Sequence, residues 1–199
     1  MKNFNVIITG IGGQGSITLA LIIAEAALKQ GYDVKTSEFH GLAQRGGSVP
    51  CHVRFDEKIF SPIVLEGNAD LIFGLEPLEA LRSCYYGSRE NSTTFLVDSR
   101  KIVPISVPVS GEKYPSLDEI KKDLKSFGEK VIILNASEKT KALTGNVLAT
   151  NVYLLGYAYA KKFIPIKKKF LLDGMKEIFR ENLFEINKKV FDAGEKDGS

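Results

Sequence analysis

The chain has 199 residues, of which 44% are hydrophobic and 26% are charged. This balance is ordinary for a soluble globular domain and argues against a disordered protein. The formal net charge of +3 is too small for a nucleic-acid-binding footprint. The longest apolar stretch, residues 17–28, is interrupted by Glu25 and is too short to span a bilayer. We therefore expect neither a nucleic acid nor a membrane as a partner.

The two cysteines, Cys51 and Cys84, limit the chemistry further. An iron–sulfur cluster needs four thiolates, and neither a zinc-binding spacing nor a C-x-x-C motif occurs. We expect no metal on this chain. The N-terminal residues lack the design of a signal peptide, and we expect no disulfide framework from two cysteines. A reducing, cytoplasmic location is therefore predicted.

The first third of the chain begins with a strand, a loop and a helix. Residues 4–9 form a short β-branched run, glycines follow, and the pattern predicts a helix over 16–30. Gly31 comes directly after this helix, as is typical of a helix C-terminus. Residues 32–37 are predicted to form a second strand, and residues 38–48 a loop.

The next segment predicts a β-hairpin. Residues 49–55 alternate between apolar and polar side chains, which indicates a half-exposed strand, and Pro50 favours an edge or a strand end. Residues 58–63 are expected to pair with this strand. Residues 69–75 are continuously apolar, as in a strand that is buried on both faces. The remaining predicted elements are helices over 77–83 and 117–127, strands over 93–98 and 131–135, and helices over 146–162, 166–179 and 183–193, with a frayed end over 194–199.

Strands that alternate with helices, followed by a run of helices, indicate one α/β domain over residues 1–199. We predict a Rossmann-like, mostly parallel sheet with an antiparallel β-hairpin insertion and a helical C-terminal extension. The α/β core would cover about residues 1–145, and the C-terminal helices about residues 146–193.

The first candidate site is a glycine loop between the first strand and the first helix. Gly10, Gly12 and Gly15 match the pattern G-x-G-x-x-G in the context that this motif requires. Such glycines allow a tight turn, the approach of a phosphate to the backbone, and close strand–helix packing. Gly13 adds open backbone, and Gln14 offers an amide. The alternative is a glycine turn that serves only close packing.

A dinucleotide site would also need an acid at the end of the second strand, and Glu38 is the candidate. Its separation from the glycines is somewhat long, and no second domain is present to hold a substrate. A stand-alone dinucleotide-binding oxidoreductase therefore stays as an alternative function.

The second candidate site is the loop that follows the second strand. It is dense in glycine and polar residues and should project beside the glycine loop, at the sheet edge where ligands bind in α/β proteins. Arg45 can bind a phosphate or carboxylate through its planar guanidinium group. Arg54, on the following strand, would extend the same basic patch. The candidates in this region are His40, Gln44, Arg45, Gly46, Gly47 and Arg54.

Several helical residues predict packing or local contacts. Glu79 and Arg82 are spaced for an ion pair on one helix. Asn146 would cap the start of an apolar helix. Asn151, inside that helix, requires a hydrogen-bond partner, and Gly156 indicates close contact with another helix.

Taken together, these motifs resemble one known family. The chain is similar to the small (beta) subunit of indolepyruvate:ferredoxin oxidoreductase and, more broadly, to the gamma subunits of 2-oxoacid:ferredoxin oxidoreductases. The resemblance covers nearly the whole chain. The matching segments are GIGGQG at 10–15, E-x-H-G-x-A-Q-R-G-G at 38–47, HVR at 52–54, GLEPLEALR at 74–82 and the helix over 145–156.

The resemblance implies the oxidative decarboxylation of an aryl pyruvate to an aryl-acetyl-CoA, with electrons passed to ferredoxin, in anaerobic aromatic amino acid catabolism. It also implies thiamine diphosphate, Mg²⁺ and [4Fe-4S] clusters on a large (alpha) subunit, with coenzyme A as co-substrate. The isolated chain should then be inactive and could form a homodimer. The glycine loop and the loop over 44–47 would bind an anionic group. A purely structural subunit is the other alternative.

Overall fold

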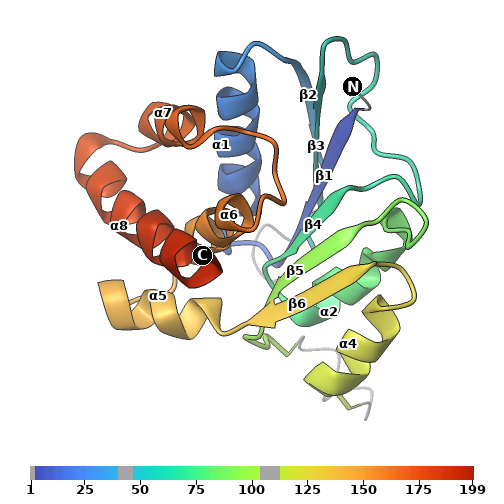
Figure 1. The fold of residues 1–199 in the computed structure, drawn as a ribbon. Helices are drawn as coiled ribbons and strands as arrows, with labels where there is room; N and C mark the ends of the chain where they lie inside the picture. Colours follow the sequence, from blue (N-terminus) through green and yellow to red (C-terminus); the bar gives the residue numbers. More distant parts are fainter. Residues whose placement is uncertain (1–2, 40–46, 104–112) are drawn as a thin grey trace.

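The structure, a computed structural model, describes residues 3–39, 47–103 and 113–199. His40, Gln44, Arg45 and Gly46 therefore lie outside the described residues. The described strands form one sheet in the order β2-β3-β1-β4-β5-β6 (Figure 1). The strands are β1 (Phe4–Thr9), β2 (Asp33–Glu38), β3 (Cys51–Asp56), β4 (Leu71–Gly74), β5 (Thr94–Asp98) and β6 (Lys130–Leu134).

The sheet is mostly parallel, as the sequence predicts. β1, β4, β5 and β6 form parallel ladders, whereas β3 lies antiparallel between β1 and β2. The antiparallel insertion is therefore confirmed, but the predicted hairpin partner is wrong. β3 pairs with β2 and β1, and residues 58–63 form no strand.

Side-chain hydrogen bonds explain why residues 58–63 nevertheless lie against β3. His52 Nδ1 accepts from the Val64 N–H at 3.0 Å. Arg54 Nη1 donates to the carbonyls of Ser61 and Ile63 at 2.8 and 3.0 Å. These bonds bury the polar side of the strand, so β3 is largely buried instead of half-exposed. The alternating pattern therefore identified a strand but not its neighbours.

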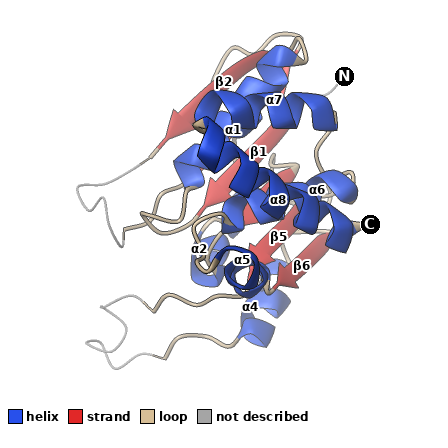
Figure 2. Ribbon diagram, turned by 90° about the vertical axis from the view of Figure 1, so that its left-hand side faces the viewer, coloured by secondary structure: helices blue, strands red, loops and turns tan. Residues whose placement is uncertain are grey.

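Helices cover both faces of the sheet (Figures 1 and 2). One face carries the larger apolar core, where α7 packs on α1 and α8 packs on α6. The other face carries a smaller core beneath α2 and α4. On the first side lie α1 (Ser16–Lys29), α5 (Ala136–Thr144), α6 (Thr150–Ala160), α7 (Lys168–Ile178) and α8 (Glu181–Gly198), and on the second lie α2 (Pro77–Arg82), the short 3-10 helix η1 (Cys84–Tyr86) and α4 (Leu117–Leu124).

The region around residue 145 differs from the sequence prediction. α5 was not predicted, because its apolar positions are few. Gly145 ends α5 with a φ of 79°, a conformation that favours glycine. Asn146 does not cap α6; its Oδ1 accepts from the Leu148 N–H at 3.0 Å, and α6 begins at Thr150. The domain boundary at about residue 145 stays a prediction.

The end of the chain is helical instead of frayed. α8 continues to Gly198 because Gly194 and Gly198 pack against the backbone of α6. Asp197 accepts hydrogen bonds from Tyr153 and Lys139, which joins α8 to α6 and α5. None of the helices in the described ranges has the length and apolar character of a bilayer span.

Candidate functional site

The candidate site lies at the edge of the sheet where the parallel strands end. β1 continues into α1 on one face, whereas β4 continues into α2 on the other face. Ligands of open α/β sheets bind in the crevice between strands whose connections diverge in this way. The glycine loop, residues 10–15, occupies this position.

Each glycine of the loop is explained by a different structural requirement. A Cβ at Gly10 would lie 3.0 Å from Leu75 Cβ, so Gly10 serves close packing. Gly13 is exposed with a φ of 101°, and a Cβ there would meet no atom within 4 Å. Gly15 has a φ of 82° and is the N-cap of α1. The loop therefore presents Gly13 to the surface and the first amides of α1 beside it.

The side chain of Gln14 links the residues that follow β1 and β4. Its Oε1 accepts from the Ile11 N–H at 2.7 Å, and its Nε2 donates to the Leu75 carbonyl at 2.8 Å. The amide thus holds the loop to the end of β4, and this side chain fixes the loop's shape.

The structure brings Gly47 to the glycine loop. The Gly12 N–H donates to the Gly47 carbonyl and the Val49 N–H to the Gly10 carbonyl, both at 2.9 Å. Ile11 and Ser48 form an isolated β-bridge between these bonds. The described end of the second loop therefore lies directly beside the first.

Glu38 and Arg54 lie apart from the glycine loop. Glu38 pairs with Cys51, which pairs with Ile8, so β3 separates Glu38 from β1 by about 10 Å. A dinucleotide site needs its acid on the strand next to β1. Arg54 pairs with Asn5 near the opposite end of β1, and its Nε donates to Asn5 Oδ1 at 2.9 Å. The expectation that Arg54 extends a patch beside the glycine loop is therefore wrong.

One cavity is lined by Gly13 and a second cavity adjoins it, and sequence reasoning found neither. The first, about 50 Å³, is lined by Gly13, Gln14 and Leu75 on one side and by Asp98 and Ser137 on the other. The second, about 470 Å³, shares Arg100, Ser137 and Val147 with the first and adds Lys141. The one feature of the sequence that pointed to these cavities is the position of Asp98 at the end of a predicted strand.

Asp98 connects β5 to α5. It is buried, and its Oδ1 accepts from the Ser137 N–H at 3.0 Å in the first turn of α5. Burial raises the pKa of Asp98, although hydrogen bonds from Ser137 oppose this shift. Arg100 and Lys141 supply positive charge at the second cavity, partly balanced by Glu138. The two cavities, together called the cleft, are thus lined by two acids, Asp98 and Glu138, and by two cations, Arg100 and Lys141. The groups there that could bind an anion are these cations and the exposed backbone of Gly13.

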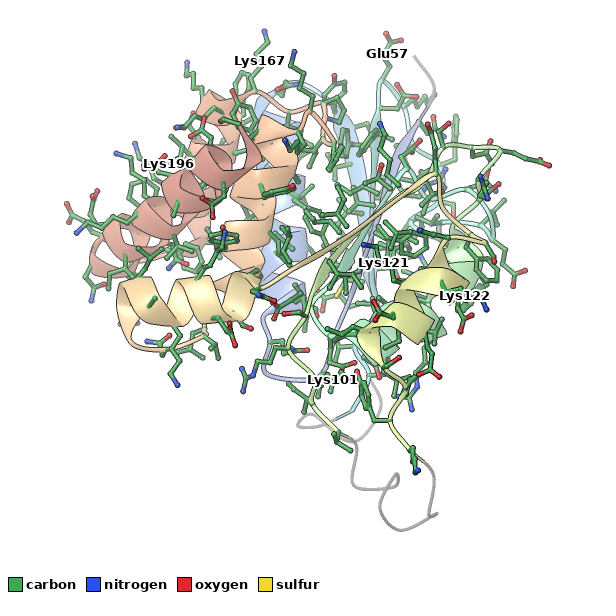
Figure 3. All side chains as sticks on the ribbon, turned by 60° about the horizontal axis from the view of Figure 1, so that its bottom comes forward. Glu57, Lys101, Lys121, Lys122, Lys167 and Lys196 are labelled. Carbon is green, nitrogen blue, oxygen red and sulfur yellow. The ribbon has the colours of Figure 1, made fainter. Side chains whose placement is uncertain are left out.

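The positive charge elsewhere is spread over the surface. Figure 3 shows Lys121 and Lys122 on α4, whereas Lys167 and Lys196 lie on the side of α7 and α8. Lys101 lies near the end of β5 and donates to the Pro115 carbonyl at 3.3 Å. What distinguishes the cleft is therefore the exposed glycine backbone that lines it.

The histidine and cysteines within the described ranges do not form a reactive group. His52 is buried, and burial, followed by the charge of Arg54, lowers its pKa to about 4. Burial raises the pKa of Cys51 to about 12 and also raises that of Cys84. No three His, Cys, Asp or Glu side chains of the described residues are grouped so that they could hold a metal.

A comparison with known protein families identifies the family of this chain. The pyruvate ferredoxin/flavodoxin oxidoreductase family matches residues 5–196. The chain belongs to this family. The resemblance inferred from the motifs is thereby confirmed, and so is the α/β fold.

Curated relatives lie in two groups. The chain is 40% identical over 190 residues to the indolepyruvate oxidoreductase subunit IorB of Archaeoglobus fulgidus, covering 96% of this chain and 92% of the relative. It is 38% identical over 197 residues to IorB of Pyrococcus horikoshii, covering 98% and 96%. The common gamma subunit of pyruvate/ketoisovalerate oxidoreductases of Pyrococcus furiosus is 30% identical over 183 residues, covering 91% and 89%.

Solved structures share the fold at lower identity. Subunit PORC of the pyruvate oxidoreductase of Thermotoga maritima superposes with a TM-score of 0.71 at 18% identity, covering 98% of this chain and 97% of that chain. The 2-oxoglutarate:ferredoxin oxidoreductase of Magnetococcus marinus gives a TM-score of 0.73 at 18% identity. That match covers all of this chain but 31% of the other, so there the same fold is part of a longer polypeptide.

Proposed function

We propose that this chain is the small subunit of an indolepyruvate:ferredoxin oxidoreductase. Four relatives named IorB, 36–40% identical over nearly the full length, support this assignment. The enzyme would convert an aryl pyruvate and coenzyme A to an aryl-acetyl-CoA and pass the electrons to ferredoxin. A cytoplasmic location fits such an enzyme.

The cofactors of this reaction belong on a large subunit in this proposal. Thiamine diphosphate would supply the carbanion chemistry, and iron–sulfur clusters would carry electrons. The residues of this chain do not fit a cluster, because Cys51 and Cys84 fall short of four thiolates and Cys51 is buried with a raised pKa. We therefore assign no step through these groups to this chain, and we expect it to be inactive without its partner.

The contribution of this chain would be to bind an anionic group at the face toward the large subunit. The observation that carries this role is the exposed backbone of Gly13, at a φ of 101°, which lines one cavity with Arg100. Lys141 lines the cavity that adjoins it. Gly47, which accepts from the Gly12 N–H, belongs to the second loop that we propose takes part in this binding. The group bound would belong to coenzyme A or would be the carboxylate of the oxoacid. A covering domain would also exclude water from reactive intermediates.

Co-expression with the large subunit tests the assignment. The purified pair should reduce a viologen dye anaerobically when indolepyruvate and coenzyme A are both present, and each chain alone should not. If the two chains fail to associate and this chain instead binds NAD, FAD or FMN, the proposal is wrong and the dinucleotide alternative replaces it.

A matched pair of glycine substitutions tests the binding role. Gly13 and Gly31 both have a φ near 100°, and a Cβ at either position meets nothing within 4 Å. Alanine at each should cost about 1–2 kcal/mol of stability. Only Gly13→Ala should raise the KM of the assembled enzyme for one of its two substrates, by about tenfold, because an obstructed amide–anion contact is worth about that factor. Unchanged KM values with weaker assembly would favour the purely structural subunit.

A further inference from the structure

The buried side-chain amide of Asn151, on α6, is hydrogen-bonded to the last residue of the glycine loop. Asn151 is the second residue of α6 and is 2% exposed. Its Nδ2 donates to the Gly15 carbonyl at 2.9 Å, and its Oδ1 accepts from the Val152 N–H at 2.9 Å. An amide at an otherwise apolar position is unfavourable unless it is bonded. The contact therefore accounts for this asparagine in an apolar helix.

The Gly15 carbonyl does not need Asn151 in order to be satisfied. It already accepts the hydrogen bond from the Leu19 N–H at 3.0 Å, which is the first bond of α1. A carbonyl oxygen can accept two bonds, so the second one orients the group instead of rescuing it. The Gly15 carbonyl and the Ser16 N–H belong to one planar trans peptide. Orienting the carbonyl therefore orients the Ser16 N–H as well.

The Ser16 N–H is the first amide of α1, directly after the glycine loop to which the proposed function assigns an anionic group. The first N–H groups of a helix have no partner inside it and carry the positive end of the helix dipole. How strongly these N–H groups bind an anion depends on the direction of their N–H bonds. The direction of this peptide is thus a property of the site.

The asparagine is held firmly enough to fix that direction. A Cβ at Gly15 would lie 2.6 Å from Asn151 Nδ2, so the amide packs directly against the glycine. On the same helix, a Cβ at Gly156 would lie 2.1 Å from the Phe191 carbonyl oxygen, so α6 is packed tightly against α8. The loop is therefore positioned from a helix that is itself held by the C-terminal layer.

We propose that Asn151 is a positioning residue, which sets the orientation of the Gly15–Ser16 peptide for the anionic group. This inference rests on the proposed function, because it assumes that the glycine loop binds a substrate. Asn151 would act through the peptide and would not touch the substrate.

The chain offers a matched control in Asn187. This residue of α8 is 7% exposed, and its Nδ2 donates to the Leu183 carbonyl at 2.8 Å, within its own helix. Asn151 and Asn187 line the same groove of about 330 Å³, but Asn187 makes no hydrogen bond to the glycine loop among the described contacts. Asn151→Leu and Asn187→Leu thus remove the same buried amide with similar volume.

Both variants are to be co-expressed with the large subunit and assayed by anaerobic viologen reduction. Asn151→Leu should raise the KM for the same substrate that Gly13→Ala affects, by about three- to tenfold, the worth of one hydrogen bond. The kcat should stay within about twofold, because the amide would act on binding. Asn187→Leu should leave both constants unchanged.

The two possible failures can be told apart. If Gly13→Ala raises a KM but Asn151→Leu does not, the positioning role is wrong and the proposed function stands. If neither variant raises a KM, both the positioning role of Asn151 and the binding role of the glycine loop are wrong. Should Asn151→Leu fail to assemble, the residual dipolar coupling of the Ser16 N–H in the full-length chain reports the peptide direction. A coupling that equals that of the wild type would overturn the proposal.

Discussion

Gly156 lies so close to Phe191 that no side chain fits between them. A Cβ at Gly156 would lie 2.1 Å from the carbonyl oxygen of Phe191, and a Cβ at Gly194 would lie equally close to the carbonyl oxygen of Tyr153. The two helices therefore meet backbone to backbone, which confirms the close contact that Gly156 predicts. This crossing fixes the position of α6. Asn151 of α6 in turn donates a hydrogen bond to the Gly15 carbonyl of the glycine loop.

Gly156→Ala should therefore destabilise the chain strongly. A methyl group there forces α6 and α8 apart, and overpacking of this kind costs about 3 kcal/mol. Lys189→Ala, at an exposed position of α8, should change stability by less than about 0.5 kcal/mol. Urea unfolding of both variants provides the measurement. Equal midpoints for the two variants would show that the crossing can relax without cost.

His52 should make stability depend on pH. In the folded chain its pKa is lowered to about 4, while the unfolded value is near the usual 6.5. The unfolded state therefore binds more protons between these values, so stability is complete above pH 6.5 and falls as the pH drops toward 4. Between pH 7 and pH 5 the loss from this one group is about 2 kcal/mol.

His52→Gln isolates this contribution. Glutamine keeps an acceptor for the Val64 N–H but does not titrate. The difference in unfolding free energy between pH 7 and pH 5 should be about 2 kcal/mol smaller in the variant than in the wild type. An unchanged difference would mean that His52 is protonated in the folded chain or reaches solvent.

Replacing either of two buried glutamates, Glu76 and Glu79, by glutamine should change stability by different amounts. Glu76 accepts from the N–H groups of Glu79 and Ile102 and from the Tyr114 hydroxyl. Glu79 bonds Arg82 at 2.6 Å through one oxygen, and its other oxygen has no hydrogen-bond partner within the described residues. Glu76→Gln faces an amide N–H toward a donor and should cost about 2 kcal/mol.

Glu79→Gln is the control for that substitution. It keeps the contact with the half-exposed Arg82, a pair worth at most about 1 kcal/mol. It also relieves a buried charged oxygen, so we expect a change within about 1 kcal/mol. Thermal unfolding of the two variants at pH 7 compares them. A larger loss in Glu79→Gln than in Glu76→Gln would contradict the assigned roles.

Local sequence patterns predicted most elements because their causes are local. The strand over 4–9 and the helix that follows it have the predicted bounds within one residue, since β-branched runs and helical periodicity act over neighbouring residues. Gly31 ends α1 with a φ of 97°, as its position predicts. The unpredicted α5 shows the limit of this approach, because a short polar helix has little periodicity to detect.

The sequence by itself determined the family, the glycine loop and the sheet edge where that loop lies. Only the tertiary structure decided which side chains share that edge. It placed β3 between β1 and β2, which separates Glu38 from the glycine loop, and the register of β3 on β1 places Arg54 near the opposite end of β1. It brought Arg100 and Ser137 to the cavity beside Gly13. It also showed that Gln14 and Asn151 hold the loop. The physical reason is that strand pairing and buried hydrogen bonds join residues far apart in the chain, and periodicity carries no record of those partners.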